Sequence, residues 1–236
     1  MIISHRGANN LEPENTIPAF IKAINLGVDM IEMDVRITKD GVPVIFHDSS
    51  LNRLFGIDQS IHDLNLKEFQ KLYLVSKNKE KIFLPTLEEV LSTIPKISLN
   101  LELKDFTEDF SFERRVIELI TSYGWEDYVW FASKRILVHK WLREYFPYKT
   151  ILLQKKRDNF ETLCLLKEIE PNAVQIRSQG LVSSFISKVH EFKINVFYFY
   201  ADQKEAFELA IKKGVDGILT NFPDLAIKFI RLIRQK

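Results

Sequence analysis

Charged residues at alternate positions mark two segments of this chain as candidates for chemistry. Glu32 and Asp34 are two residues apart, and so are Glu102 and Lys104. Alternate residues of a β-strand point to the same face, so each pair presents its charges on one side. Carboxylate oxygens are the ligands that hard divalent cations such as Mg²⁺ and Ca²⁺ prefer. We therefore predict that Glu32, Asp34 and Glu102 converge on a divalent cation, either Mg²⁺ or Ca²⁺.

The same carboxylates allow a second interpretation, an ion-pair network without a metal. Arg6 and Lys104 could neutralise them. Burying an unpaired charge costs several kcal/mol, so the carboxylates need cationic partners under either interpretation. Inward-facing strand positions rarely carry so many charges without a function, which favours the metal site.

Two histidines and two cations supply the other groups that phosphodiester chemistry requires. His5 and Arg6 follow one apolar segment, and His47 follows another. A guanidinium binds phosphate through two hydrogen bonds, and Lys104 adds a point charge. Histidine titrates near neutral pH and serves as a general acid or base. We predict that His5 and His47 are catalytic and that Arg6 and Lys104 bind the phosphate, with the acid and base roles left open.

Alternating β-type and helical segments must position these residues. This alternation is typical of βα units around a parallel sheet, and eight units fit the 236 residues. We therefore predict an α/β fold, a (β/α)8 TIM barrel, whose active site lies at the carboxyl ends of the strands. The expected strands are 2–4, 29–35, 97–103, 128–132, 150–153, 173–176, 194–200 and 216–220; the expected helices are about 15–26, 86–93, 111–123, 135–145, 159–169, 184–192, 203–213 and 223–234.

One segment interrupts the alternation after the second strand. Asp40-Gly41 between two β-type runs indicates a hairpin. A turn centred near residues 39 and 40 would place His47 roughly opposite Glu32. Residues 49–84 then form a small insertion beside the barrel mouth. We expect a single TIM-barrel catalytic domain over residues 1–236, with this β-hairpin and insertion after strand 2.

The overall composition excludes several classes of protein. Lys and Arg total 33 and Asp and Glu total 32, so the net charge of +1 is too small to indicate nucleic-acid binding. One cysteine excludes a disulfide framework. No apolar run approaches the ~20 residues of a membrane span, and the first residues lack a signal-peptide pattern. We expect a cytoplasmic protein without a stable membrane anchor, and the sequence does not indicate its oligomeric state.

The chain resembles the glycerophosphodiester phosphodiesterase family in several short motifs, which occur in the family's order. The match covers almost the whole chain. The motifs are His5-Arg6-Gly7, Pro13-Glu14-Asn15-Thr16, Glu32-Met33-Asp34-Val35, Lys39-Asp40-Gly41-Val42-Pro43-Val44, His47-Asp48, Leu51-Asn52-Arg53, Pro85-Thr86-Leu87-Glu88-Glu89, Glu102-Leu103-Lys104 and the segment from Gly214 to Asp224.

The resemblance implies hydrolysis of a small-molecule glycerophosphodiester to sn-glycerol 3-phosphate and an alcohol. It also implies a divalent cation at Glu32, Asp34 and Glu102 and acid–base roles for His5 and His47. The nucleophile could be water or the free hydroxyl of the substrate's glycerol, which would give a transient cyclic phosphate.

The chain departs from the family pattern at four places. Tyr198 stands where the family often has Trp, and we expect it to form an aromatic wall that binds substrate. Asn221 replaces the usual acidic residue after Thr220. The other two departures are Ala132-Ser133 in place of Ser-Phe, and Leu54 in place of Thr after Arg53.

Three other functions remain as alternatives. A lysophospholipase D-like phosphodiesterase on the same scaffold would have a larger apolar pocket mouth. A non-catalytic phosphate-binding barrel would not need paired acid–base groups. A phosphosugar isomerase or aldolase could use Lys104 alone, but it would leave the carboxylate cluster unexplained.

Overall fold

Eight parallel strands close into a barrel in the computed structural model, which describes residues 1–154, 160–177 and 181–234. Strand β1 pairs with both β2 and β11, so the sheet has no free edge within the barrel. This closure confirms the predicted (β/α)8 barrel. The barrel strands are β1 Ile2–His5, β2 Met30–Ile37, β6 Ser98–Leu103, β7 Val129–Ser133, β8 Lys149–Leu153, β9 Ala173–Arg177, β10 Asn195–Phe199 and β11 Gly217–Thr220.

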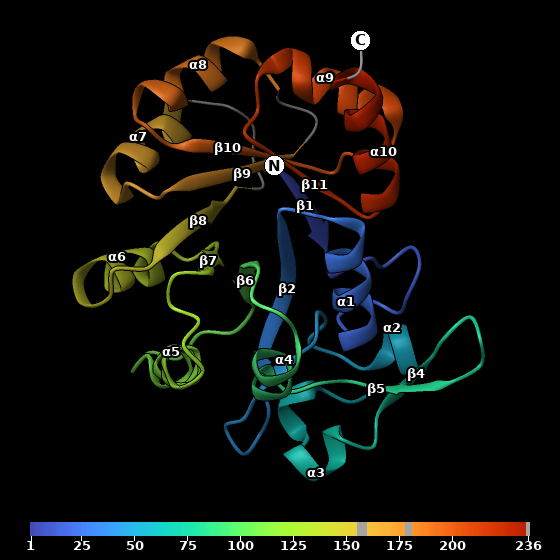
Figure 1. Ribbon diagram of the computed structural model, residues 1–236. Coiled ribbons are helices and arrows are strands. Elements are labelled where there is room, and N and C mark those ends of the chain that lie inside the picture. The colour runs from blue at the N-terminus through green and yellow to red at the C-terminus, as the bar shows by residue number, and fades with distance from the viewer. Residues whose placement is uncertain (155–159, 178–180, 235–236) are drawn as a thin grey trace.

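Helices lie outside the strands, as Figure 1 shows. The helix Leu87–Thr93 begins with the expected capping box: the Thr86 hydroxyl accepts from Glu89 N at 3.1 Å, and the Glu89 carboxylate accepts from Thr86 N at 2.7 Å. The helices that follow the barrel strands are α1 Ile17–Leu26, α4 Leu87–Thr93, α5 Ser111–Ser122, α6 Ile136–Tyr145, α7 Phe160–Ile169, α8 Ser183–Glu191, α9 Lys204–Lys213 and α10 Pro223–Arg234.

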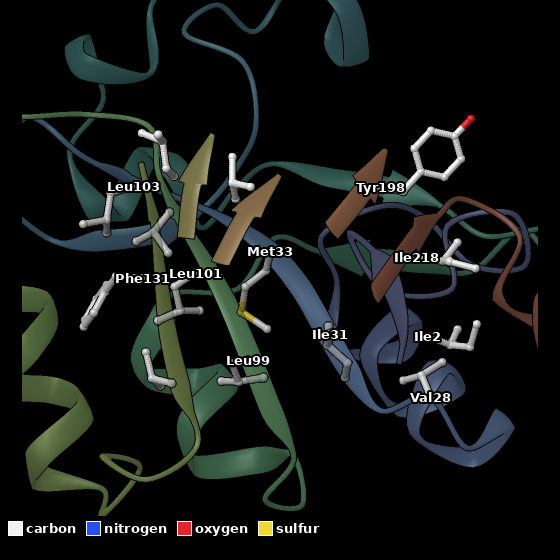
Figure 2. Packing of buried hydrophobic residues seen from close by; sticks show 14 of the residues in the cluster. Ile2, Val28, Ile31, Met33, Leu99, Leu101, Leu103, Phe131, Tyr198 and Ile218 are labelled. Atoms are coloured by element: carbon white, nitrogen blue, oxygen red, sulfur yellow. The ribbon is translucent and has the colours of Figure 1, made fainter. Parts of the chain in front are cut away.

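The apolar core forms two layers, one on each face of the strands. The larger layer fills the space between strands and helices and includes Met33 and Leu103 (Figure 2). A smaller cluster, with Met30 and Phe197, fills the barrel interior. Because side chains alternate along a strand, the outward position of Met33 turns its neighbours Glu32 and Asp34 inward. The predicted orientation of the charged residues is therefore confirmed.

The hairpin after β2 has a different register from the predicted one. Strand β3, Pro43–Ile45, runs antiparallel to β2 with Val35 opposite Ile45. This register, continued, places residue 47 opposite Met33, so the prediction that His47 faces Glu32 was wrong by one residue. The cause is a three-residue loop, closed by a bond from Thr38 N to Val42 O at 3.0 Å, with Gly41 in the left-handed region at φ 81°.

The segment between β3 and α4 forms a small folded excursion, seen at the bottom of Figure 1. Its apolar residues pack into a cluster with Val44 and Phe46 of the hairpin, which anchors it beside the barrel. The position of this cluster fixes Asp48 and Arg53 at the barrel mouth. The elements of the excursion are α2 Asn52–Phe55, the 3-10 helix η1 Ile61–Asp63, α3 Leu66–Phe69 and the antiparallel pair β4 Tyr73–Val75 and β5 Lys81–Phe83.

The helices of the described segments are short. Their lengths range up to 12 residues, as in α5 and α10. None of those that the structure describes is both long and apolar enough to cross a bilayer.

Candidate active site

Three carboxylates from two neighbouring strands converge inside the barrel. Glu32 and Asp34 lie on β2, and Glu102 lies on β6 directly beside Asp34. One oxygen from each carboxylate lies within 4.8 Å of the others. Glu32 and Asp34 are 3% and 0% exposed. The structure thus brings the three predicted ligands together in a buried cluster.

Arg6 and Lys104 contact this cluster but do not saturate it. Arg6 Nε lies 3.1 Å from Asp34 Oδ2, and Lys104 Nζ lies 3.0 Å from Asp34 Oδ1 and 2.7 Å from Glu102 Oε1. Burial alone would raise the pKa of Asp34, but Lys104 and Arg6 hold it below its usual value. Burial, reinforced by Asp34 and Glu102, raises the pKa of Glu32. Arg6 and Lys104 therefore offset the burial of Asp34 but not that of Glu32.

The carboxylate cluster fits a divalent cation. Its three donors are all oxygens, which suits a hard ion. Asp34 Oδ1 is buried and accepts no aligned hydrogen bond from the described residues, despite its proximity to Lys104. A bound cation would occupy such an oxygen and would reverse the like-charge crowding that raises the pKa of Glu32. Glu32, Asp34 and Glu102 are thus able to hold a metal ion.

A tight loop after β1 positions Arg6 beside the carboxylate cluster. Arg6 and Gly7 have φ of 56° and 79°, and a Cβ on Gly7 would lie 2.8 Å from the Ala19 backbone carbon. Asn15, also left-handed at φ 55°, donates from Nδ2 to Asp34 Oδ2 at 2.8 Å. The loop therefore fixes both Arg6, a predicted phosphate-binding residue, and the orientation of Asp34, a predicted metal ligand.

Glu14, Asp48 and Arg53 connect the excursion to two of the predicted site residues, Arg6 and His47, a role that sequence reasoning did not assign. Arg6 donates to Glu14 Oε1 at 2.9 Å, and Arg53 donates to the same oxygen at 2.6 Å. Arg53 Nε also donates to Asp48 Oδ2 at 2.5 Å, and Asp48 Oδ1 lies 2.7 Å from His47 Nδ1. Arg53 thereby links Glu14, which contacts Arg6, to Asp48, which contacts His47.

His5 is held by a neutral amide, and the amide is held by a carboxylate. Asn221 Nδ2 and backbone N donate to Asp202 at 2.7 and 2.8 Å. Because a carboxylate only accepts, the Asn221 oxygen faces His5 Nδ1, 2.6 Å away. His5 Nδ1 must therefore be the donor, which leaves Nε2 unprotonated in the neutral ring.

His5 Nε2 faces the cluster, 3.9 Å from Glu32 Oε2. Burial, helped by Arg6, lowers the pKa of His5 to about 4. The pKa of His47 is also lowered, chiefly by burial.

Sequence reasoning did not identify Asp202 because nothing in its local pattern connects it to residue 221. The unusual Asn221 after Thr220 was the available signal.

Tyr198 does not form the predicted wall of the site. Its side chain is 2% exposed and belongs to the layer between strands and helices (Figure 2). Phe197 and Phe199 point to the interior instead, since they alternate with Tyr198 along β10. Phe199 and Tyr200 line the mouth, and both rings lie edge-on to His5, with centroids 5.2 and 5.7 Å away.

A recess of about 610 Å³ opens over these groups at the carboxyl ends of the strands. Its size lies in the ~300–1,000 Å³ range of ligand pockets. It contains His47, Glu102 and Lys104, so a ligand can reach the acid–base and phosphate-binding candidates together. The lining residues are Arg36, His47, Asp48, Ser49, Glu102, Leu103, Lys104, Ser133, Lys134, Arg135, Arg177 and Tyr200.

Comparisons with known proteins agree on one family. Residues 5–225 match the model of the glycerophosphoryl diester phosphodiesterase family. The chain is 30% identical over 237 residues to the glycerophosphodiester phosphodiesterase of Caldanaerobacter subterraneus subsp. tengcongensis, and 98% of each chain is covered. It is 25% identical to a human lysophospholipase D, covering 94% of this chain and 83% of that one.

A solved structure has the same fold. The phosphodiesterase of Oleispira antarctica, in complex with the product sn-glycerol-3-phosphate, superposes with a TM-score of 0.90. The identity is 22%, and the match covers 98% of this chain and 96% of that one.

Proposed function

Because the chain belongs to the glycerophosphoryl diester phosphodiesterase family, we propose that its barrel mouth hydrolyses glycerophosphodiesters to sn-glycerol 3-phosphate and an alcohol. Such an enzyme is a phosphoric diester hydrolase. The observation that carries the proposal is the buried carboxylate cluster with His5 on one side and the recess that His47 lines on the other. A non-catalytic phosphate-binding barrel would not need this pairing.

Charge neutralisation is the first task of the proposed site. Glu32, Asp34 and Glu102 would hold a divalent cation, which as a Lewis acid would withdraw charge from the phosphoryl oxygens. Arg6 contributes a fork of N–H donors and Lys104 a point charge for those same oxygens. The burial of Glu32 and Asp34 strengthens these interactions because charges interact more strongly away from bulk water. Asn15 and Glu14 keep Asp34 and Arg6 oriented.

Proton transfer follows from the different partners of the two histidines. His5 donates to a neutral amide, which leaves its Nε2 lone pair available to take the proton of the nucleophile. His47 lies against the Asp48 carboxylate, which stabilises a protonated ring able to give its proton to the leaving alcohol. We assign His5 as the base and His47 as the acid of the first step.

Two nucleophiles are compatible with these roles. If water attacks, its proton goes to His5 and the alcohol leaves with the proton of His47. If the substrate's glycerol hydroxyl attacks, a cyclic phosphate forms, and water opens it in a second step with the two histidines exchanging roles. Detection of a cyclic phosphate at early times distinguishes the second route from the first.

Replacement of His47 tests the proposed function. His47→Ala should lower kcat by roughly 10²–10⁴, the usual contribution of a general acid or base. His62→Ala is the matched control, because His62 belongs to the same excursion but lies outside the recess. Equal rates for His47→Ala and the wild type would remove His47 from the mechanism.

A second candidate, a lysophospholipase D-like activity, rests on a separate recess. This recess has a volume of about 320 Å³ and lies beside Glu14. The apolar part of its lining includes Leu11, Leu54 and Leu74, and the remainder includes charged side chains. An acyl chain attached to the substrate's glycerol could lie there. The comparison of glycerophosphocholine with lysophosphatidylcholine decides between the two activities, and Leu74→Asp should lower only the rate on the acylated substrate.

A further inference from the structure

A narrow cavity extends the recess toward strands β8, β9 and β10. Its volume is about 90 Å³, well above the ~10–15 Å³ that a single water needs. It shares His47, Glu102 and Lys104 with the larger recess, so it lies next to the phosphate-binding groups. The other lining residues are Lys134, Leu153, Gln154, Gln175, Arg177, Phe199 and Tyr200.

Gln175 brings a buried acceptor to this cavity. Its side chain is 8% exposed, and Oε1 accepts no hydrogen bond from any residue that the structure describes. The neighbouring Gln154 amide is already engaged, since it donates to the Thr162 hydroxyl at 3.1 Å. A buried acceptor without a donor is costly, so a ligand with a hydroxyl group would stabilise this position.

Arg177 brings positive charge to the same cavity. Its guanidinium carbon lies 5.9 and 6.0 Å from the ring centroids of Phe199 and Tyr200. Within the described parts of the chain it forms no ion pair, whereas the acidic residues Glu102 and Asp48 at the mouth are paired with cations. The aromatic faces that could bind a quaternary ammonium are thus already covered by a cation.

We propose that this cavity receives the alcohol half of the diester and selects a compact, uncharged polyol of glycerol size over cationic alcohols such as choline. A polyol satisfies both groups, because one hydroxyl donates to Gln175 Oε1 and another accepts from Arg177. Choline offers no hydroxyl once esterified, and its charge is repelled by Arg177. This selectivity rests on the proposed function, since it uses the same phosphate site.

The test compares two diesters that share the glycerol 3-phosphate half. The wild type should show kcat/KM for glycerophosphoglycerol roughly tenfold or more above that for glycerophosphocholine, given one hydrogen-bond pair and one charge repulsion. Arg177→Gln should narrow the ratio by raising kcat/KM for the choline ester. Gln175→Leu should narrow it by lowering kcat/KM for the polyol ester. Arg177→Lys, which keeps the charge, should retain the rejection of choline.

Arg143→Gln is the control, because this Arg lies on α6 outside the cavity and pairs with Glu170. It should leave the ratio unchanged. A preference of the wild type for glycerophosphocholine would overturn the proposal. So would an equal loss on both diesters in Arg177→Gln and Gln175→Leu, because the cavity would then hold the shared glycerol half.

A binding measurement separates failure of the selectivity from failure of the proposed function. Calorimetry can measure how tightly His47→Ala binds each of the two diesters. This variant should bind glycerophosphoglycerol more tightly than glycerophosphocholine. Tighter binding of glycerophosphocholine would overturn the selectivity. If the wild type cleaves neither diester with Mg²⁺ or Ca²⁺, the proposed function fails, and these binding measurements still test the cavity.

Discussion

The chain of contacts from His5 through Asn221 to Asp202 predicts a defined loss of rate in Asn221→Ala. The substitution removes the acceptor of the 2.6 Å bond from His5 and the donor of the 2.7 Å bond to Asp202. His5 then has no partner that fixes its tautomer or its ring orientation. Loss of the whole base would cost roughly 10²–10⁴, which is the upper limit. Loss of a residue that orients a functional histidine costs about 10–100-fold, and we expect this smaller effect.

The assay must separate kcat from KM. Since Asn221 does not touch the phosphate-binding groups, kcat should fall by about 10–100-fold while KM changes by less than about threefold. Asn221→Asp keeps an acceptor for His5 but loses the donor to Asp202 and places two carboxylates side by side, so it should recover only part of the rate. Asn10→Ala is the control. Asn10 follows Asn9, which donates to Asn221 Oδ1 at 2.7 Å, but Asn10 itself donates to Asp224, away from His5.

Nitrogen chemical shifts of His5 give the direct structural readout. In the wild type Nδ1 should be protonated and Nε2 unprotonated, and Asn221→Ala should populate both tautomers. The reasoning is refuted if the wild-type ring carries its proton on Nε2. It is refuted equally if Asn221→Ala scrambles the tautomers while kcat stays within about twofold of the wild type.

Three further predictions concern the metal, the pH profile and the fold. Glu32→Gln should be inactive, and added Mg²⁺ or Ca²⁺ should not restore its activity in a metal titration. A variant that these ions still stimulate would contradict this. Burial lowers the pKa of His5, and this base must be unprotonated to act, so the acidic limb of kcat/KM should lie below pH ~6.5, the ordinary histidine value; an acidic limb above that pH contradicts the assignment of His5 as the base. In Gly7→Ala, the alanine would have a φ of 79° and a Cβ 2.8 Å from the Ala19 backbone. The free energy of unfolding in urea should therefore fall by about 2–4 kcal/mol. An unchanged midpoint of urea unfolding would argue against this packing.

The alternation of side chains along a strand predicted the inward-facing residues correctly in strands whose sequence alternates between polar and apolar residues. Glu32 and Asp34 alternate with apolar residues on β2, so the sequence itself indicates which side chains face inward. In contrast, β10 reads Phe197-Tyr198-Phe199, three aromatic residues in a row. Such a run contains no polarity signal to identify its inward face, which is why Tyr198 was assigned to the wrong side.

Long-range partners were beyond the reach of local patterns. Asp202 and Asn221 meet because β10 and β11 end side by side, and Glu14 meets Arg53 across 39 residues. Neither contact leaves a spacing signal in the chain. The hairpin register was missed for a related reason, because a turn signal marks where the chain reverses but not whether its loop has two or three residues.

Release of sn-glycerol 3-phosphate from a small panel of glycerophosphodiesters, with and without a chelator, tests the central claim most directly. The proposed site predicts that the purified protein releases glycerol 3-phosphate, that the chelator stops the reaction, and that excess Mg²⁺ or Ca²⁺ restores it. Failure on every diester in the presence of both metals would contradict the proposed function. Full activity in the chelator would contradict the role proposed for Glu32, Asp34 and Glu102.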